Sequence, residues 1–588
     1  MNFPSNKFRG RQPIKSFHLE AISFSMSAGK QVVECVPNFS EGRDKETIST
    51  ICSEIESVEG VKLLDVDPGS ATNRTVVTFV GAPEHVLEAA FLAIKKASEV
   101  IDMSNHHGEH PRMGATDVCP FVPVANVSME ECVDLARRLG KRVGEEIGIP
   151  IYLYENAASC KERRNLATCR SGEYEGLEEK LKDPKWKPDF GPSTFNPKSG
   201  ATVIGARDFL VAYNVNLNTT SVRRANSVAF DIREQGRIQR EGCPITGAIC
   251  KDSEGKPIRI PGTCKSVKGI GWFIKEYGIA QISMNLTNIS VTSLHAAFEA
   301  CCESATSRGL RVTGSELVGL VPLKVMMDAG HYFLRKQKRS LGIPEAEVIK
   351  IAVKSLGLDE LSPFDPRKKI IEYQLEDETS SPLLQLNLKE FAYETASESP
   401  APGGGSISAY VGALGSALAC MVANLSAHKP GWDDRCEEFS EWAERAQKIN
   451  EQLLRLVDED TNAFNAIMEA YKMSKGNADE IAKRSEAIQT ATKNAIEVPL
   501  QVMKTALQSF DVIKAMAETG NPNSVTDAGV GALCSRAAVR GAFLNVKVNA
   551  GSLKDRTYGS EALKSGEAML QQAEEAENTI LEIVNRKI

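Results

Sequence analysis

The chain lacks the features that mark several common protein classes. Its 588 residues include 70 Lys and Arg against 77 Asp and Glu, so it has no excess of positive charge with which to bind nucleic acid. None of its 14 cysteines forms a Cys-x-x-Cys pair, and their scattered positions are typical of reduced, mostly buried thiols in an intracellular protein. No glycine-rich segment ends in the Gly-Lys-Ser/Thr of a nucleotide P-loop, so ATP is not indicated.

Residues 1–30 have no sustained apolar stretch, which argues against a secretory signal. We interpret this extension as a disordered tail. A mitochondrial or other organelle transit segment is the alternative, since basic side chains outnumber acidic ones there. Further along, residues 407–425 are apolar over nearly the length of a membrane span, but they consist mainly of Ala, Gly and Ser. We therefore expect a helix packed closely inside a soluble bundle, and no transmembrane segment.

The hydrophobic pattern changes once along the chain. From residue 32 to about 375, short β-branched or apolar runs alternate with amphipathic stretches, which predicts an α/β architecture. From residue 387 onward almost every segment has a helical period, which predicts an all-α helical bundle. In the first part, the expected strands include 61–65, 75–81, 201–217 and 281–291, and the expected helices include 83–98, 129–147 and 293–308.

A chain of this length is expected to form roughly three or four folding units. A run of Pro, Gly, Ser and Asn at 187–200 marks a subdomain junction or a binding loop. Residues 234–268 have the composition of an insertion or surface loop. We therefore divide the chain into an extension (1–30), two α+β or α/β subdomains (31–209 and 210–375), a linker (376–386) and a helical domain (387–588).

Three of the eight histidines lie in one short loop, His106-His-Gly-Glu-His-Pro-Arg-Met-Gly114. A loop imidazole can take a proton from an attacking amine and return it to a leaving nitrogen, because its ordinary pKa lies near neutrality. Pro111 restricts the backbone of His110 to extended conformations, so the chain itself aims that imidazole. The alternatives are solvated loop residues or metal ligands, although the three histidines lack the helical i, i+4 pairing or Cys partner of common zinc sites.

Polar residues follow the first strands of the α/β part, where open sheets build their sites. Asn38 lies in the turn that ends the first strand, and Asp67 and Arg74 follow the second strand. We expect these turns to share one cleft with the His110 loop. Arg74 is suited to bind a substrate carboxylate through two hydrogen bonds. The alternative is a surface ion-pair residue, which would have little functional significance.

Two polar clusters flank helices of the predicted bundle. The apolar helix at 407 is preceded by three glycines and a serine, namely Gly403, Gly404, Gly405 and Ser406. Successive backbone N–H groups at a helix N-terminus form a cradle for an anion, and a flexible capped loop is the alternative. A second cluster is a candidate for the same site, or an Asx turn with a helix N-cap, and its polar residues include Asn523, Ser524 and Asp527.

Asp460 interrupts an apolar stripe in the helical part. In steps of three and four residues, the stripe consists of Leu453, Val457, Asp460, Phe464, Ile467 and Tyr471. Burying an unpartnered carboxylate costs several kcal/mol, so Asp460 either pairs with a donor or has a raised pKa suited to proton transfer. The alternative is a buried anchor for a neighbouring helix. Asp458 lies about 200° away around the helix, and we interpret it as a solvated charge.

Together these segments resemble the formiminotransferase-cyclodeaminase family, bifunctional folate enzymes of histidine breakdown. Four segments are similar to the transferase half: Val33 to Gly42, Asp65-Val-Asp67 with Asn73-Arg74-Thr75, Gly108 to Gly114, and Asp189-Phe-Gly-Pro-Ser193. Ala401 to Ser406 and Val457-Asp-Glu-Asp460 are similar to the cyclodeaminase half. Only residues 1–30 and part of 237–268 fall outside the resemblance. Thr461-Asn462 departs from the Ala-Glu that often follows the family's aspartate.

The resemblance implies roles for residues at matching positions. The transferase general acid/base is the histidine before Pro-Arg-Met-Gly, here His110, with Asp67 and Arg74 positioning substrate groups. The cyclodeaminase carboxylate is the second Asp of Val-Asp-x-Asp, here Asp460. The implied folate-binding loop consists of Gly191, Pro192, Ser193, Thr194, Phe195, Asn196, Pro197, Lys198, Ser199 and Gly200.

The resemblance also implies a reaction sequence and an assembly. A formimino group moves between N-formimino-L-glutamate and N5 of tetrahydrofolate, and N10 then closes onto that carbon with loss of ammonia, giving 5,10-methenyltetrahydrofolate. The folate is expected to be polyglutamylated, with no metal and no nucleotide. The expected assembly is a homo-octamer in the cytoplasm, with peripheral Golgi and centriole or centrosome association.

Two alternatives belong to other functional classes. A catalytically silent scaffold that binds Golgi or cytoskeletal surfaces would keep the fold for assembly alone, but it would gain no stability from a carboxylate in a helix seam. A metal-dependent hydrolase built on the three loop histidines would contain metal when the purified protein is analysed.

Overall fold

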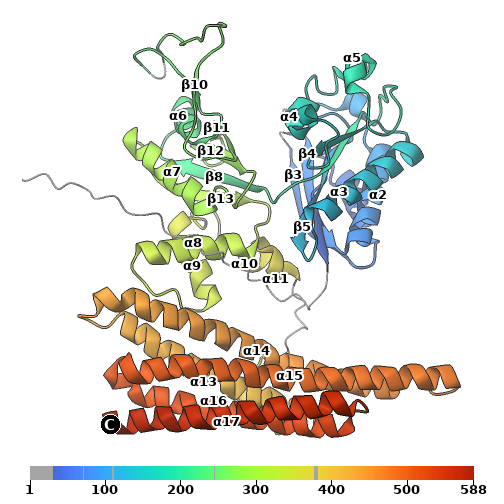
Figure 1. Ribbon diagram of the computed structural model, residues 1–588. Coiled ribbons are helices and arrows are strands. Elements are labelled where there is room, and N and C mark those ends of the chain that lie inside the picture. Colours follow the sequence, from blue (N-terminus) through green and yellow to red (C-terminus); the bar gives the residue numbers. More distant parts are fainter. Residues whose placement is uncertain (1–30, 71, 109–110, 244–245, 376–381) are drawn as a thin grey trace, which may run out of the picture. The chain divides into compact units, whose positions relative to one another are not determined.

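The computed structural model describes residues 31–588 except 71, 109–110, 244–245 and 376–381. It divides into two compact units, the first ending at Phe209 and the second being Leu210–Ile588. Strands occur in the first unit and early in the second, and the remainder of the second unit is helical (Figure 1). The predicted fold class, an α/β half fused to an all-α bundle, is therefore confirmed. The predicted extension and most of the predicted linker lie outside the described residues.

The first unit is built on a seven-stranded mixed sheet. Its order is β1-β4-β2-β5-β7-β6, with β3 paired to β4. The β5–β7 and β7–β6 pairs are parallel, and the other pairs are antiparallel. The strands are β1 (Val32–Cys35), β2 (Asn38–Phe39), β3 (Val61–Gly69), β4 (Arg74–Gly81), β5 (Thr116–Ala125), β6 (Ile151–Glu155) and β7 (Thr202–Ala206).

Both faces of this sheet are covered, because successive residues of a strand point to opposite sides. Ile151 and Leu153 belong to a large core beneath the longer helices, whereas Tyr152 and Tyr154 belong to a smaller core on the other face. The longer helices are α1 (Lys45–Glu56), α2 (Pro83–Val100) and α3 (Met129–Arg142), which continues into a π-helical turn, and the short ones are α4 (Leu166–Cys169) and α5 (Leu177–Lys182).

Two strand predictions need correction. The predicted strand 61–65 continues to Gly69 and pairs antiparallel with β4, so Asp67 lies within a hairpin strand rather than in a turn after it. The predicted strand 201–217 is two strands, β7 in the first unit and β8 (Val211–Leu217) in the second. The charged pair Arg207-Asp208 lies between the two strands and marks the break that the single predicted strand overlooked.

The second unit begins with a four-stranded antiparallel sheet of order β11-β12-β8-β13. Helices α6 and α7 pack against it, and α8 packs against α9. The predicted insertion contains the small ribbon β9 (Arg237–Ile238) and β10 (Arg259–Ile260). The other elements are β11 (Val267–Ile274), β12 (Ile279–Leu286), β13 (Val312–Val318), α6 (Val222–Ile232), α7 (Leu294–Ser307), α8 (Leu323–Lys336), α9 (Glu345–Leu356), α10 (Pro366–Lys369) and α11 (Ile371–Leu375).

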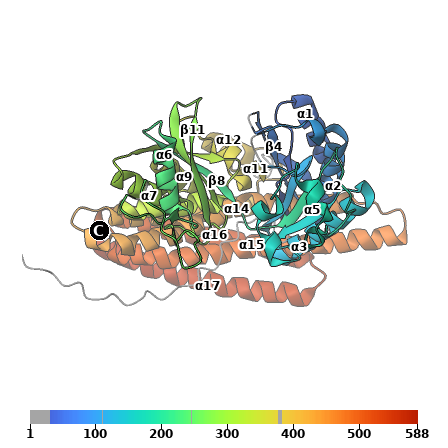
Figure 2. The same cartoon turned by 90° about the horizontal axis from the view of Figure 1, so that it is seen from above.

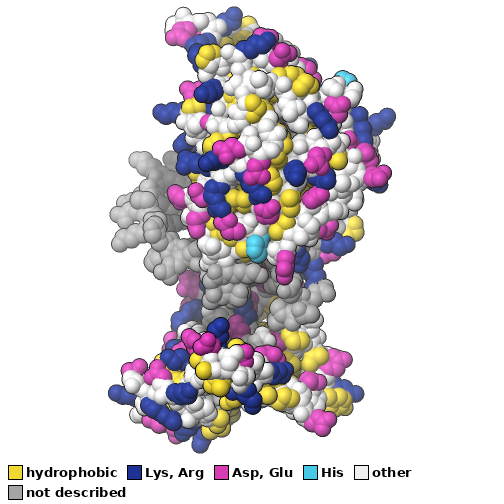
Figure 3. Space-filling model, turned by 90° about the vertical axis from the view of Figure 1, so that its right-hand side faces the viewer, with side chains coloured by type: hydrophobic (Ala, Val, Ile, Leu, Met, Phe, Trp, Pro, Cys, Tyr) yellow, Lys and Arg dark blue, Asp and Glu magenta, His cyan; other side chains and the backbone are white. Residues whose placement is uncertain are grey.

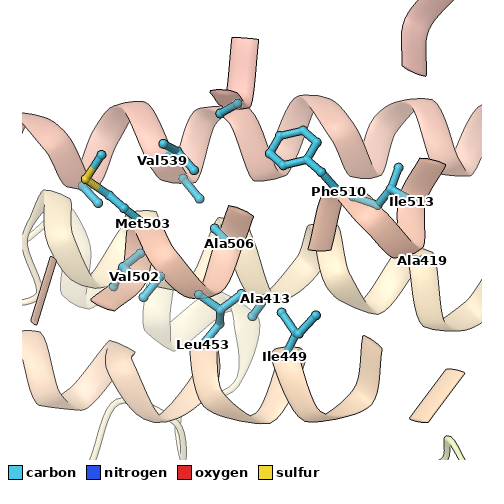
Figure 4. Packing of buried hydrophobic residues seen from close by; sticks show 14 of the residues in the cluster. Ala413, Ala419, Ile449, Leu453, Val502, Met503, Ala506, Phe510, Ile513 and Val539 are labelled. Atoms are coloured by element: carbon cyan, nitrogen blue, oxygen red, sulfur yellow. The ribbon is translucent and has the colours of Figure 1, made fainter. Parts of the chain in front are cut away.

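The helical domain packs around α13, whose small side chains allow close approach of its neighbours. A methyl group added at Gly415 would lie 2.9 Å from the Gly531 carbonyl oxygen of α16, so only glycine fits there. Figure 4 shows the aliphatic core where α13, α14, α15 and α16 meet. The helices are α12 (Leu388–Thr395), α13 (Gly404–Ala427), α14 (Cys436–Lys472), α15 (Ala478–Thr519), α16 (Val525–Ser552) and α17 (Arg556–Lys587).

Among the described residues, α13 is the one helix long and apolar enough to cross a membrane. Of its most apolar stretch of 18 residues, 61% is buried inside the bundle. The turn between α14 and α15 projects beyond the end of α17 (Figures 1 and 2). Basic and acidic side chains are interspersed over the face drawn in Figure 3, in keeping with the nearly balanced charge of the sequence.

Candidate functional sites in the two halves

Asn73 joins three loops of the first unit. Its backbone has a φ of 48°, a left-handed conformation that asparagine tolerates better than most residues. Its Oδ1 accepts the Gly42 N–H at 3.0 Å, and its Nδ2 donates to the His107 carbonyl at 3.1 Å. Its own carbonyl oxygen lies 2.8 Å from Nε2 of His106. The turns after β2 and β3 therefore meet the histidine loop, as the sequence led us to expect.

His106 is fixed in one orientation by partners on both ring nitrogens. Nε2 donates to the Asn73 carbonyl, and Nδ1 accepts from Nε of Arg112 at 3.2 Å. Because Arg112 can only donate, these partners assign a neutral imidazole protonated at Nε2. Burial lowers the pKa of His106, which also favours the neutral form. His106 is therefore a structural residue, and a metal ion would have to displace one of these bonds to bind it.

Arg112 is buried and holds the histidine loop to the segment around Glu175. Its guanidinium donates to Glu175 at 2.6 and 2.8 Å, to Glu173 at 3.3 Å and to the His106 carbonyl at 3.2 Å. These groups border an open hollow of about 420 Å³, whose lining residues are His107, Gly108, Arg112, Gly172, Glu173 and Glu175. His110 and Glu109 lie outside the described residues, so the position of the predicted acid/base is an expectation from the sequence.

The predicted folate loop, 191–200, lies directly beside the histidine loop. The Ala115 N–H donates to the Ser199 carbonyl at 2.9 Å, and the Ala201 N–H donates to the Met113 carbonyl at 3.0 Å. The Tyr174 hydroxyl donates to the Pro197 carbonyl at 2.5 Å. Within the loop, Ser199 and Gly200 are buried, whereas the exposed residues are Gly191, Ser193, Thr194, Pro197 and Lys198. The buried end thus anchors an exposed stretch next to residues 106–114.

A buried ion pair that the sequence did not single out holds the other end of this loop. Asp189 accepts from Arg163 and from the Leu153 N–H, both at 2.7 Å. The same guanidinium donates to the Lys187 carbonyl at 2.7 Å. Asp189 begins the segment Asp189-Phe-Gly-Pro-Ser193, whose resemblance to the transferase half had already drawn attention to it. Arg163 sits in an ordinary charged run, and nothing in its neighbourhood distinguished it.

The other predicted residues of this half are placed as follows. Arg74 is half-buried on β4, and burial lowers its pKa to about 10, partly offset by the nearby Asp117 carboxylate. Asn38 is buried in β2 and donates to the Val36 carbonyl at 2.9 Å, so it shapes its own turn. Asp67 is exposed on β3. In the described part of the chain, no group of three or more His, Cys, Asp or Glu side chains is arranged to hold a metal ion.

In the helical domain, Asp460 of α14 lies against the N-terminus of α13. The Ser406 hydroxyl donates to its Oδ2 at 3.1 Å. A methyl group added at Gly405 would overlap the carboxylate, so only glycine allows this approach. Burial raises the pKa of Asp460, and hydrogen bonds from the Ser406 side chain and backbone partly oppose that rise. The helix N-terminus that was predicted to cradle an anion thus faces the carboxylate of the chain itself.

The second polar cluster does not reach Asp460 within one chain. The Asn521 N–H donates to the Ser426 hydroxyl at 2.8 Å, which places this cluster beside the C-terminal end of α13. Asp460 lies at the opposite end of that 24-residue helix, about 35 Å away at 1.5 Å per residue. The hypothesis that this cluster joins the Asp460 site is therefore wrong for a single chain, and it concerned Asn523, Ser524 and Asp527.

The interpretation of Asp458 as a solvated charge is also wrong. Its side chain is buried and accepts the Leu383 and Leu384 N–H groups at 3.0 and 3.3 Å. The helix does turn Asp458 away from Asp460, but the segment that follows residue 381 covers it. That contact joins positions about 75 residues apart, so no local pattern indicated it.

Comparison with known proteins follows the same division of the chain. Residues 32–207 match the model of the formiminotransferase domain, N-terminal subdomain, residues 212–376 that of the formiminotransferase domain, and residues 387–568 that of formiminotransferase-cyclodeaminase. A formimidoyltransferase-cyclodeaminase of Dictyostelium discoideum is 43% identical over 560 residues, covering 95% of this chain and 99% of that protein. The chain belongs to the formiminotransferase-cyclodeaminase family.

Two shorter relatives each match one half. A glutamate formimidoyltransferase of Thermoplasma acidophilum is 47% identical over 306 residues, which are 52% of this chain and 92% of that protein. A methenyltetrahydrofolate cyclohydrolase of Methylorubrum extorquens is 36% identical over 201 residues, which are 34% of this chain and 97% of that protein. The two halves therefore resemble proteins that also exist separately.

Proposed function

We propose that this chain is a bifunctional folate enzyme of histidine degradation. It transfers the formimino group between N-formimino-L-glutamate and tetrahydrofolate, and then converts 5-formiminotetrahydrofolate into 5,10-methenyltetrahydrofolate and ammonia. The observation that carries the proposal is the Asp460 carboxylate, partly buried against Gly405 and Ser406. Relatives with both activities in their name, and a separate glutamate formimidoyltransferase, support it.

In the transferase half, the proposed catalytic group is His110. N5 of the folate attacks the formimino carbon to give a tetrahedral intermediate, and the imidazole carries a proton from the attacking nitrogen to the nitrogen of the departing glutamate. The network of Asn73, His106 and Arg112 holds the loop on which His110 lies. Asp67 and Arg74 are the proposed positioning groups for the substrate, and the loop 191–200 the proposed folate contact.

In the helical domain, Asp460 is the proposed base and acid. N10 of the folate attacks the formimino carbon, the carboxylate accepts the N10 proton, and it then returns that proton to the departing nitrogen, which leaves as ammonia. A carboxyl group whose pKa is raised by burial accepts a proton from nitrogen more readily than a solvated one. Gly403 and Gly404, which begin the helix against this carboxylate, are proposed to line the same site.

The test is an absorbance assay for methenyltetrahydrofolate, with ammonia measured in parallel. Purified protein is given tetrahydrofolate and formiminoglutamate, and both products are expected in equal amounts. Protein that binds folate but forms neither product would contradict the proposal and favour the scaffold alternative. The partly buried, hydrogen-bonded Asp460 argues against a scaffold, because a carboxylate removed from water adds little stability by itself.

We propose polyglutamylated tetrahydrofolate as co-substrate, and neither a metal nor a nucleotide as cofactor. Both ring nitrogens of His106 already have partners, which leaves the histidine loop poorly suited to bind zinc. Activity is expected to survive dialysis against a chelator. Loss of activity that returns only with added metal would contradict this point.

We also propose that the chain forms a homo-oligomer, as an octamer. Large hydrophobic side chains are exposed in one stripe along α13 and another along α16, at spacings of 3, 4, 7 or 11 residues that keep each stripe on one face of its helix. The residues are Leu414, Met421, Leu425, Val530, Leu533, Leu544 and Val548. Light scattering is expected to show a smaller assembly for Leu414→Glu with Leu533→Glu, and an unchanged assembly would contradict this interface.

The proposed location is the cytoplasm, with peripheral association at the Golgi and the centrosome. Residues 1–30, fused to a fluorescent reporter, test the alternative of mitochondrial targeting. A diffuse reporter supports the cytoplasmic proposal, and a mitochondrial one contradicts it.

A further inference from the structure

The Asp460 carboxylate is the first member of a chain of three polar side chains. The Ser406 hydroxyl lies 3.1 Å from Oδ2 of Asp460 and also 3.1 Å from Oγ1 of Thr461. Ser406 is completely buried, so solvent does not replace either partner. Because a hydroxyl has one proton, Ser406 can donate to only one of these groups at a time.

We infer that Thr461 is a positioning residue for the cyclodeaminase step, which sets the direction of the Ser406 hydroxyl for each protonation state of Asp460. This inference rests on the proposed function of Asp460. When the carboxylate is ionised, Thr461 donates to Ser406 and Ser406 donates to Asp460. When Asp460 has taken the N10 proton, its O–H donates to Ser406, Ser406 donates to Thr461, and Thr461 turns to the Val457 carbonyl one helical turn back.

Without Thr461 each arrangement would lose one hydrogen bond of Ser406. The loss costs more in the first arrangement, because there the Thr461 bond supports a charge-assisted hydrogen bond from Ser406 to the ionised carboxylate. A hydroxyl that accepts one hydrogen bond donates a stronger one. When Thr461 donates to Ser406, the Ser406 hydroxyl therefore binds the ionised Asp460 carboxylate more strongly and favours that form. Removing the Thr461 hydroxyl should therefore raise the pKa of Asp460 above its present value.

Few other groups act on this carboxyl. In the described part of the structure, the pKa of Asp460 is shifted by burial and by hydrogen bonds from Ser406. The facing N-terminus of α13, Gly403 to Ser408, has no titratable side chain, and the α16 side chain that lies beside Gly404 is the uncharged amide of Asn545. On α14 itself, Asp458 binds the Leu383 and Leu384 N–H groups. Glu459 points away from this site: desolvation raises its pKa, and the nearby Arg455 partly opposes that rise.

The test compares Thr461→Val, which removes the hydroxyl at nearly constant volume, with Thr461→Ser, which keeps it. Thr492→Val in α15 is the control, because Thr492 is another helical threonine, buried and bonded to the Ile488 carbonyl at 2.7 Å but far from Asp460 in the sequence. Ammonia release from supplied 5-formiminotetrahydrofolate is measured against pH in the full-length enzyme. The carboxyl carbon of Asp460 is titrated by carbon-13 NMR in the same proteins.

In Thr461→Val, we expect the rate of ammonia release to fall by about fivefold, which corresponds to the loss of one hydrogen bond. The low-pH limb of the pH–rate profile should move up by about half a pH unit. The carbon-13 titration of Asp460 should move in the same direction. Formimino transfer should be unchanged, and Thr461→Ser and Thr492→Val should behave as wild type. An unchanged pH profile and titration in Thr461→Val, or equal impairment in Thr461→Ser, would overturn the inference. Wild-type protein that releases no ammonia would instead contradict the proposed function, and the titration would still report whether Thr461 acts on Asp460.

Discussion

The two candidate sites hold their chemical groups by different means. In the first unit, side-chain hydrogen bonds tie loops to one another, with Asn73, His106 and Arg112 at the centre. In the helical domain, Asp460 is held chiefly by close packing of one helix on another, with Ser406 as its hydroxyl donor. A loop site of the first kind depends on specific donors and acceptors, whereas a helix-seam site depends on volume. Substitutions that change one property should therefore affect the halves unequally.

The largest expected effect separates the two activities. Asp460→Asn should lower ammonia release about a thousandfold while formimino transfer continues, because the amide cannot carry the proton. His110→Ala should do the reverse. Formimino transfer is measured as the disappearance of formiminoglutamate. Ammonia release is measured separately, with 5-formiminotetrahydrofolate supplied as the substrate. Loss of both activities in either variant would contradict two independent sites.

Gly405→Ala tests the role of volume in the helical site. The added methyl group overlaps the Asp460 carboxylate, and a displacement of about 1 Å is expected to lower ammonia release about a hundredfold. Gly551→Ala is the matched control, because that helical glycine faces open space. It should keep full activity and gain about 0.5–1 kcal/mol in unfolding free energy. Equal activities in the two variants would contradict the packing argument.

Arg112→Met tests the role of hydrogen bonds in the loop site. The substitution keeps the side-chain stem and removes every donor to Glu173, Glu175 and His106, so we expect transfer to fall about tenfold with ammonia release unchanged. Arg138→Met, which breaks an exposed pair with Glu84, should leave both activities near wild type. A transfer rate that Arg112→Met does not lower would show that the loop does not need this network.

Asp458→Asn sharpens the contrast between neighbouring carboxylates. Asp458 accepts two backbone N–H groups, and its replacement should cost about 1–2 kcal/mol in unfolding free energy without changing ammonia release at 25 °C. Urea denaturation and the ammonia assay measure the two quantities on one sample. A large fall in the rate with unchanged stability would mean that the roles of Asp458 and Asp460 were assigned the wrong way round.

The smallest expected effect is on acid stability. Burial lowers the pKa of His106 below 6.5, so the unfolded chain takes up a proton that the folded one refuses. Its contribution to stability is present above pH 6.5 and is lost as the pH falls from there towards the folded-state pKa. Protonation at Nδ1 would turn a second donor towards Arg112 and loosen the loop.

Amide exchange at Gly42, whose N–H is bonded to Asn73, reports this loosening. Exchange should become faster between pH 6.5 and 5.5 after correction for the intrinsic rate. His106→Gln should show a weaker pH dependence, since glutamine does not titrate. Identical pH dependence in both proteins would show that another group controls the loop.

The sequence indicated those parts of the sites that depend on local pattern. The helical period placed Asp460 among apolar residues, and Gly405 and Ser406 at the start of α13 were recognised before their contact was known. Turn residues after successive strands correctly suggested that the loops around Asn73 and His106 meet.

Contacts between distant segments were not predictable in this way. Nothing near Asp458 shows that residues 383–384 cover it, and nothing near Arg163 shows that it pairs with Asp189. The same limit explains why the sequence alone suggested a place for Asn523 at the far end of α13. The error at residues 201–217 is different, because the local charged pair Arg207-Asp208 does separate the two strands.

The most direct test of two sites acting in sequence is complementation between full-length variants. His110→Ala and Asp460→Asn proteins are given tetrahydrofolate and formiminoglutamate, separately and mixed, and methenyltetrahydrofolate is followed by absorbance. Each variant alone should form almost none, and the mixture should restore it as the Asp460→Asn protein supplies 5-formiminotetrahydrofolate to the other. A mixture as inactive as its components, although free 5-formiminotetrahydrofolate is detected, would contradict the account.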